Sequence, residues 1–163
     1  DFDGADFAYN EALSQSGWGA PQLHAQSLGL WLRPAVESGA HYMSARAVVA
    51  GQADLAALDV ISWALMQRED PELCADLRVT GMTPPSPGLP FIPAKGRDPA
   101  PLFAALKSAI AALSPEDRMM LQLRDILAIP EAVYLAVPNP PSPAQLAQRH
   151  APIRAICHAK PVK

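Results

Sequence analysis

The chain is organised around the stretch Ser14-Gln15-Ser16-Gly17-Trp18-Gly19, which follows a strand-like run, Phe7-Ala8-Tyr9-Asn10, and leads into a helix-like run. A strand, then a turn rich in hydroxyls and glycine, then the start of a helix offers free backbone N–H groups and the positive end of a helix dipole. These groups attract anions. The stretch therefore predicts that an oxyanion is the first ligand to consider.

Hydrophobic periodicity predicts alternating strands and helices over the first half of the chain. Helices are expected at 19–32, ended by Pro34, and at 41–50, 60–67 and 71–76; after the first strand, further strands are expected at 53–58 and 77–80. Helices of this length between strands are typical of a mostly parallel sheet that is covered on both faces. The predicted fold class is therefore α/β.

Polar residues fall at three junctions of this pattern. Ser14–Gly17 and Asp59 each follow a predicted strand, and His41 opens a helix after a short segment around Val36. In parallel sheets, ligands bind outside the carboxyl ends of the strands. We therefore expect these three junctions to meet at one edge of the sheet and to line one cleft.

Composition excludes several classes of protein. The chain has 163 residues, half of them hydrophobic and 18% charged, with a formal net charge of −3. This is an ordinary globular mixture, and the absence of a Lys/Arg cluster argues against nucleic acid as a partner. The longest apolar run, 53–65, is interrupted by Asp59, and it is shorter than the roughly 20 residues of a membrane span.

Proline divides the chain in two. Of its 18 prolines, 15 lie at or after Pro84, so the second half is expected to consist of helices between proline-rich connections. Helices are predicted at 102–113, at 115–127 with Ser114 as the N-cap, and at 143–156. The cysteines, Cys74 and Cys157, could form a bridge in an oxidising compartment, but isolated thiols are favoured.

The order of motifs resembles that of the periplasmic substrate-binding proteins of phosphate, phosphite and phosphonate ABC transporters. The motifs are Ser14-Gln15-Ser16-Gly17, Ser38-Gly39-Ala40-His41, Gly51-Gln52-Ala53-Asp54-Leu55-Ala56-Ala57-Leu58-Asp59 with Ser62-Trp63, and the return from Leu77 to Phe91. The order and spacing of the motifs carry the resemblance. It covers most of residues 6–93 in order and, more loosely, the helices to about residue 135.

The resemblance implies a fold and a cellular role. Family members have two α/β lobes, and the solute binds in the interlobe cleft before it is passed to an ABC transporter permease. Residues 1–85 would be the inserted lobe, and 86–163 the segment that returns to an incomplete first lobe. The resemblance implies a periplasmic protein without cofactor or catalysis. The chain carries no signal peptide and starts without Met, which predicts a mature or trimmed product.

The resemblance also implies which residues bind the ligand. Ser14 and Ser16 match the hydroxyl pair that donates to phosphorus-bound oxygens, Gln15 stands where many members have Thr, and Gly17 completes the turn. His41 matches a histidine that contacts the same oxygens, and Asp59 matches an acidic position of the phosphate-like and phosphite-like members. Ile61 stands where aminophosphonate binders can place a carboxylate, which weakens that assignment.

The chemistry of the residues is consistent with this assignment. Hydroxyls and helix N-terminal amides can neutralise an oxyanion without full counter-charges. A protonated P–OH group is a donor, so the carboxylate of Asp59 would favour a protonated oxyanion over sulfate.

A purely structural role stays open for each of these residues. Ser14, Ser16, His41 and Asp59 could be helix caps, and a metal site is not expected because the histidines lack ligand spacing. A hydrolase with Ser16, His41 and Asp59 as a triad is an alternative, although the stretch lacks the first glycine of a nucleophile elbow. A third hypothesis is a non-binding lobe that forms a homodimer through apolar surface of its incomplete half.

Overall fold

The computed structural model describes residues 2–149, which divide into two units. One unit contains the chain up to Thr83 and the chain from Asn139 onward, and the other contains Pro84–Pro138. The first boundary lies close to the predicted division at residue 85, whereas residues after Asn139 join the first unit. The predicted assignment of 1–85 to an inserted lobe, and of 86–163 to a segment returning to a first lobe, stays a prediction.

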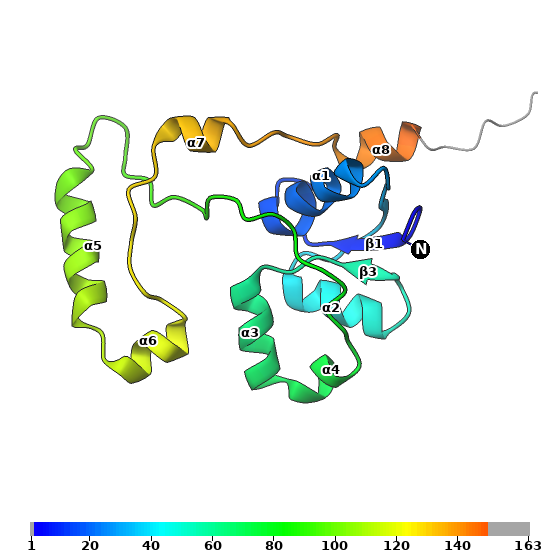
Figure 1. Cartoon of the computed structure of the whole chain (residues 1–163), viewed down its shortest axis with the longest axis horizontal. Helices are drawn as coiled ribbons and strands as arrows, with labels where there is room; N and C mark the ends of the chain where they lie inside the picture. Colours follow the sequence, from blue (N-terminus) through cyan, green and yellow to red (C-terminus); the bar gives the residue numbers. More distant parts are fainter. Residues whose placement is uncertain (1, 150–163) are drawn as a thin grey trace, which may run out of the picture. The chain divides into compact units, whose positions relative to one another are not determined.

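The first unit is a small α/β structure (Figure 1). In chain order its elements are β1 (Asp6–Tyr9), a turn of π-helix η1 (Gln15–Gly19), α1 (Ala20–Ser27), β2 (Arg33–Glu37), α2 (His41–Val49), β3 (Leu55–Ala56), α3 (Val60–Glu69), α4 (Pro71–Ala75) and α8 (Pro143–Arg149). The three strands are parallel, in the order β2-β1-β3. The predicted α/β class with a parallel sheet is confirmed.

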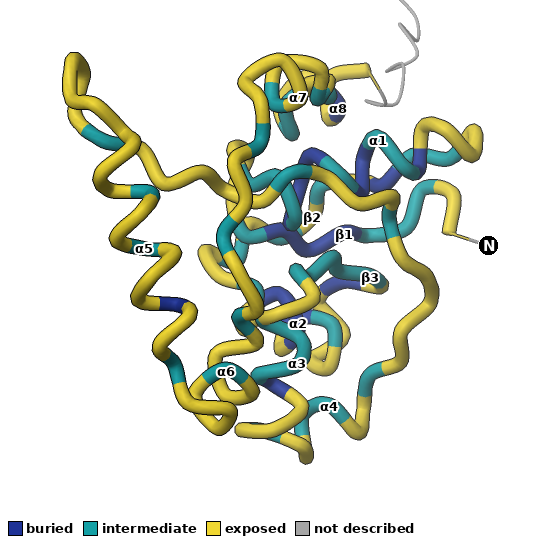
Figure 2. Tube along the Cα trace, turned by 60° about the vertical axis from the view of Figure 1, so that its left-hand side comes forward, coloured by how far each residue is buried: buried dark blue, intermediate teal, exposed yellow. Residues whose placement is uncertain are grey.

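Most of the central strand β1 is buried (Figure 2), and its residues belong to two core clusters. Phe7 and Tyr9 point to one face, where they pack with Trp18, Ala25 of α1 and Leu146 of α8. The Trp18 indole also donates a hydrogen bond to the Pro141 carbonyl at 3.2 Å. These contacts join the chain after Asn139 to the first unit.

The opposite face of β1 is built from small side chains. Ala8 is fully buried there and packs with Ala47 of α2 and Ala53, which precedes β3. Because neighbouring residues of a strand point to opposite faces, the alternation from Phe7 to Tyr9 explains the two core clusters. Helices therefore cover both faces of the sheet, as the sequence predicted.

The prediction of one helix over residues 19–32 was wrong at its end. The helix stops at Ser27, Gly29 turns the chain with φ of 72°, and Arg33–Glu37 forms β2. Proline within a strand is tolerated at the edge of a sheet, where its missing N–H costs no ladder hydrogen bond. Since β2 lies at the edge of the described sheet, Pro34 marks a strand and not the end of a helix.

The predictions for the later strands were also partly wrong. Of the run 53–58, Leu55–Ala56 is a strand, and residues 77–80 form no strand. Val79 is 60% exposed. Its β-branched side chain favours a strand, but no described strand pairs with this segment. Without a pairing partner, residues 77–80 do not form a strand.

The second unit contains α5 (Ala100–Ala112), α6 (Pro115–Leu121) and α7 (Glu131–Leu135). Ser114 caps α6 as predicted, with its Oγ accepting from the Asp117 N–H at 3.0 Å. The helix ends at Leu121 and not near Leu127, because Gln122 takes a left-handed conformation with φ of 53°. α7 lies in a segment that was predicted to be a loop.

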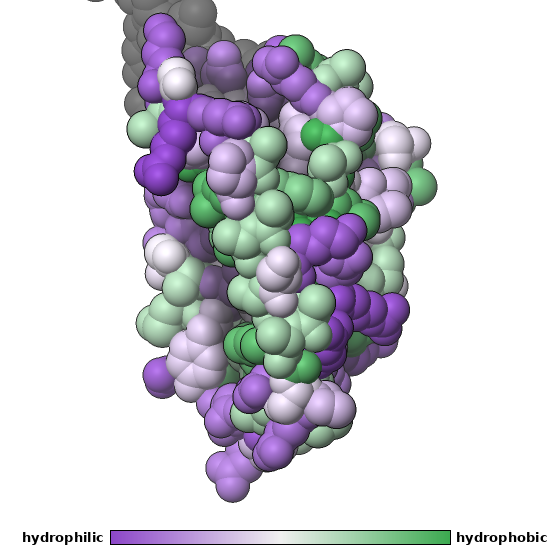
Figure 3. All heavy atoms as spheres, turned by 90° about the vertical axis from the view of Figure 1, so that its left-hand side faces the viewer, coloured by the Kyte–Doolittle hydropathy of each residue, from purple (hydrophilic) through white to green (hydrophobic). Residues whose placement is uncertain are grey.

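Most large apolar side chains of this unit are accessible. Ile110 is buried, whereas these are exposed: Leu102, Met119, Met120, Leu121, Leu127, Val133 and Leu135. Figure 3 shows apolar side chains interspersed with hydrophilic ones on the face that it views. The self-association predicted for an incomplete lobe stays a prediction.

Several other expectations concern absences or the end of the chain. Among the described residues, no helix combines the length and apolar character that a membrane crossing needs. Cys74 forms no disulfide with another described residue, and Cys157 lies outside the described part. The helix predicted at 143–156 is present as Pro143–Arg149, and its remainder lies outside the described residues.

Candidate functional site

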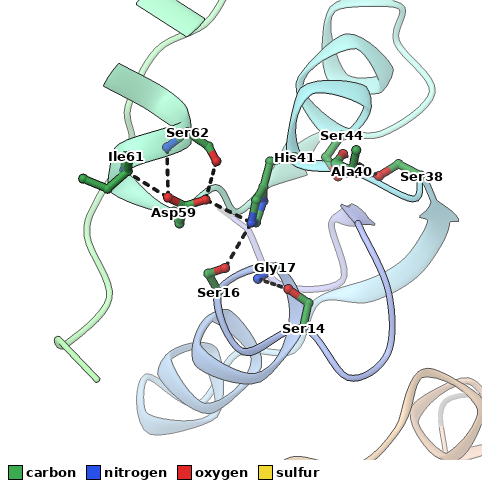
Figure 4. A network of polar contacts seen from close by, with 10 residues as sticks. All are labelled: Ser14, Ser16, Gly17, Ser38, Ala40, His41, Ser44, Asp59, Ile61 and Ser62. Carbon is green, nitrogen blue, oxygen red and sulfur yellow. Dashed lines mark hydrogen bonds and ion pairs between the residues drawn. The ribbon is translucent and has the colours of Figure 1, made fainter. Parts of the chain in front are cut away.

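Three loops meet at the carboxyl edge of the parallel sheet (Figure 4). The loop after β1 carries Ser16, the loop after β2 leads to His41, and the loop after β3 carries Asp59. The Oγ of Ser16 lies 3.0 Å from Nε2 of His41, and the same nitrogen lies 3.2 Å from Oδ2 of Asp59. The predicted convergence of these three junctions is therefore confirmed.

The turn Ser14–Gly19 is fixed by its own side chains. Ser14 is the N-cap of η1, and its Oγ accepts a hydrogen bond from the Gly17 N–H at 3.0 Å. The backbone carbonyl of Ser14 accepts from both Trp18 and Gly19. Figure 4 shows Ser14 directed into this turn and Ser16 directed toward His41.

Gln15 does not extend toward the histidine. A Cβ placed on Gly19 would lie 2.5 Å from the side-chain oxygen of Gln15, so the amide folds back along its own helix. If Gln15 contacts a ligand in this conformation, it does so through its backbone. The two serine hydroxyls are the better placed side-chain donors of the stretch.

His41 is held in place by the loop that precedes it. The Oγ of Ser38 donates to the carbonyl of Tyr9 at 3.1 Å and lies 2.6 Å from Oγ of Ser44, which is fully buried. The Gly39 N–H donates to the carbonyl of Asn10. Since β1 anchors this loop, the first residue of α2 is placed beside the turn that follows β1.

Asp59 is the N-cap of α3, and its acceptor sites are filled. Oδ1 accepts from the backbone N–H groups of Ile61 and Ser62 at 3.0 and 2.9 Å, and Oδ2 accepts from the Ser62 hydroxyl and contacts His41. Partial burial acts to raise the pKa of Asp59, but the hydrogen bonds from Ser62, the charge of His41 and the Ile61 N–H together outweigh it. The pKa is lowered, and Asp59 is ionised at neutral pH.

The tautomer of His41 sets the role of the Ser16 hydroxyl, because Nε2 can act as a donor or an acceptor. A proton on Nε2 suits the contact with Asp59, since an ionised carboxylate accepts but does not donate. With that proton present, Nε2 has no lone pair for Ser16, and Ser16 Oγ acts as an acceptor toward the ring. The hydroxyl proton of Ser16 is then free to be donated to a ligand.

The same geometry does not match a hydrolytic triad. In a triad, the serine and the carboxylate contact different ring nitrogens, so that one accepts the serine proton while the other donates to the carboxylate. Here Ser16 and Asp59 share Nε2, and Nδ1 of His41 is buried with no hydrogen-bond partner in the described structure. The arrangement therefore differs from that of a triad, and the cluster offers hydrogen-bonding groups.

Two residues of the site were not identified from the sequence. Ser62 bonds Asp59, and Asn10 follows β1 with its side-chain oxygen buried and without a partner among the described residues. The position of Asn10 directly after a strand was a signal that could have been used. For Ser62 the signal was its place in the capping turn that Asp59 begins.

Within residues 2–149, no group of three or more His, Cys, Asp or Glu side chains could hold a metal ion. The groups that Ser14, Ser16 and His41 do offer at the strand ends are hydroxyls and an imidazole.

Comparison with known proteins assigns the chain to a family. The family model described as "ABC transporter, phosphonate, periplasmic substrate-binding protein" matches residues 1–132. No curated protein matches the chain. The match spans the sheet, the three loops and the helices α5 and α6. The chain thus belongs to the family of periplasmic substrate-binding proteins of phosphonate ABC transporters.

Proposed function

We propose that the edge formed by Ser14–Gly17, His41 and Asp59 binds a phosphorus oxyanion of the phosphonate, phosphite or phosphate kind. The observation that carries the proposal is the shared contact of Ser16 and Asp59 with Nε2 of His41, in a chain of this family. The protein then acts in the periplasm as the solute-binding component of the transporter and delivers its ligand to the permease.

Each residue has a distinct role in this proposal. Ser16 donates its free hydroxyl proton, and Ser14, whose Oγ already accepts from Gly17, can donate its own. The start of the continuous helical segment Gln15–Ser27 adds first-turn backbone amides, including that of Gln15, and a favourable dipole. These donors suit an anion without requiring a Lys or Arg side chain.

Asp59 has a different role from the direct ligand contact that the sequence predicted. Its oxygens are engaged by Ile61, Ser62 and His41, so we assign it the orientation of the imidazole. His41 then presents its ring beside Ser16. Enclosure of the ligand follows from closure of a second lobe over this edge, without covalent chemistry.

The proposal is tested by calorimetric titration of the full chain with methylphosphonate, phosphite, phosphate and sulfate. Ser16→Ala should weaken binding of the phosphorus anions by about tenfold or more, because a hydrogen bond to a charged group is lost. Ser86→Ala, at an exposed position of the second unit, is the matched control and should leave affinity unchanged. Binding that does not respond to Ser16→Ala would contradict the assignment.

A parallel assay separates the two remaining hypotheses. Hydrolysis of an activated ester that disappears in Ser16→Ala would overturn the binding role in favour of catalysis. A measurement of mass in solution tests self-association. A dimer that binds none of the four anions would favour the non-binding lobe.

A further inference from the structure

An open pocket of about 400 Å³ adjoins the polar cluster, between the start of α2 and one face of α3. His41 and Ser62 belong both to its lining and to the cluster around Asp59. The pocket is therefore continuous with the edge at which we place the oxyanion. A ligand held at Ser16 and His41 can extend into it.

The lining of the pocket is mainly apolar. Ala40 and Tyr42 contribute from the start of α2, and Leu65 and Met66 contribute from α3. Asn10 is the other polar lining residue besides His41 and Ser62. Among the described residues that line it, none carries a carboxylate, an ammonium or a guanidinium group.

The pocket is larger than an oxyanion head needs. A water molecule occupies about 30 Å³ of liquid, so 400 Å³ corresponds to on the order of ten waters. Ligand pockets begin at roughly 300 Å³. A bare phosphite or phosphate would leave most of this apolar space filled with water, whereas a carbon substituent would displace that water.

We propose that this pocket receives the carbon substituent of a phosphonate, and that the preferred substituent is uncharged and apolar. The inference rests on the proposed function, because His41 joins the pocket to the oxyanion site. A phosphonate has two chemical halves, an oxyanion and an organic group, and the structure offers a polar and an apolar surface side by side.

An aminoalkyl substituent does not suit the same pocket. Burial of an ammonium requires a counter-charge. The carboxylates that contact lining residues are already engaged: Asp59 by Ile61, Ser62 and His41, and Asp70 by the Tyr42 hydroxyl at 2.8 Å and the Leu73 N–H. Neither belongs to the pocket lining. The structure therefore favours alkyl over aminoalkyl phosphonates.

The test is a calorimetric series on the full chain with phosphite, methylphosphonate, ethylphosphonate, n-propylphosphonate and 2-aminoethylphosphonate. Affinity should rise about fourfold for each methylene buried, and so about 15-fold from methyl to propyl. The 2-aminoethyl compound, which has nearly the shape of the propyl compound, should bind about tenfold more weakly than propylphosphonate or worse.

Variants at Leu65 test the location of the substituent. Leu65→Ala should reduce the gain in affinity from methyl- to propylphosphonate. Leu65→Glu introduces a carboxylate into the half-exposed helix face and should reverse the preference between the propyl and 2-aminoethyl compounds. Leu102→Ala, on exposed α5, is the control and should change neither ratio.

The possible failures are distinguishable. If all phosphorus anions bind with equal affinity, or if the 2-aminoethyl compound binds most tightly, the inference is overturned while the proposed function stands. If no phosphorus anion binds to the folded chain, both are overturned. If affinity still rises with the length of the alkyl substituent in Leu65→Ala, the placement of the substituent in this pocket is also refuted.

Discussion

Gly17 is the position at which one methyl group should disturb the site most. A Cβ built on Gly17 would lie 1.7 Å from Oδ1 of Asn10 and 3.0 Å from Oγ of Ser14. Carbon and oxygen cannot approach to 1.7 Å without a bond, so the Asn10 side chain must move in Gly17→Ala. The φ angle of Gly17 is not among the positive ones, so the requirement for glycine is steric and not conformational.

Three contributions set the expected loss of stability in Gly17→Ala. Overpacking of a filled site costs about 1–3 kcal/mol, and displacement of the Ser14 cap adds about 1 kcal/mol. Alanine is the better helix former by about 1 kcal/mol, which offsets part of this loss. We expect Gly17→Ala to lower the free energy of unfolding by about 2 kcal/mol.

Urea unfolding of a double-mutant cycle isolates the steric contact. Asn10→Ala alone should have a small effect, because Oδ1 has no hydrogen-bond partner in the described residues and the backbone carbonyl that accepts from Gly39 is retained. In Gly17→Ala/Asn10→Ala the new methyl group enters the vacated space. The double variant should therefore recover about 1–2 kcal/mol relative to additivity.

Gly81→Ala is the matched control, since no atom lies within 4 Å of a Cβ at that position. It should change stability by less than about 1 kcal/mol. The reasoning is refuted if Gly17→Ala is as stable as the unmodified chain, or if its effect and that of Asn10→Ala simply add.

Two further predictions concern titration. Asp59→Asn should cost about 1 kcal/mol at neutral pH, because the hydrogen bonds from Ile61 and Ser62 to a charged acceptor become bonds to a neutral one. Because the folded pKa of Asp59 is lowered, its charge stabilises the fold above the unfolded pKa of roughly 3.9, and the difference between the two proteins should shrink as pH falls below that value. Urea unfolding between neutral and acid pH checks this, and a difference that grows toward acid pH would contradict it. The hydrogen bond to Asp70, with smaller contributions from desolvation and the Asp70 charge, raises the pKa of Tyr42, so Asp70→Asn should lower the midpoint of its phenol titration in ultraviolet absorbance; an unchanged midpoint would exclude the bond.

The convergence of the site could be predicted from topology alone. Ser16, His41 and Asp59 follow successive parallel strands. The carboxyl ends of parallel strands lie at the same edge of a sheet, and this holds even where the exact bounds of a strand are not predicted. This explains why His41 lies beside Ser16 and Asp59 as expected, although β2 was not recognised from the sequence. The Pro34 in that strand resembles a helix terminator when sheet order is unknown.

Details that depend on tertiary contact could not be predicted. A sequence does not show that Ser62 and His41 contact the oxygens of Asp59, so it could not distinguish a ligand contact from orientation of the imidazole. The close approach of Asn10 to Gly17 likewise appears only once the turn is built. In the second unit, Ser114 and Pro115 predicted the start of α6, whereas its end depends on the left-handed Gln122.

In the proposal, different residues recognise the oxyanion head and the carbon substituent of the ligand. A mutation can therefore change the affinity for all phosphonates without changing the preference among them. In the proposal, Ser16 contacts the oxyanion head, which is identical in every alkyl phosphonate, whereas Leu65 lines the pocket that we assign to the substituent. Selectivity is a difference between two binding free energies. Loss of a contact with the oxyanion head changes both free energies equally, so the ratio of the two affinities stays the same. Ser16→Ala should weaken methyl- and propylphosphonate by the same factor, and Leu65→Ala should change their ratio. If Ser16→Ala altered the ratio instead, head and substituent would not occupy the separate surfaces that His41 joins.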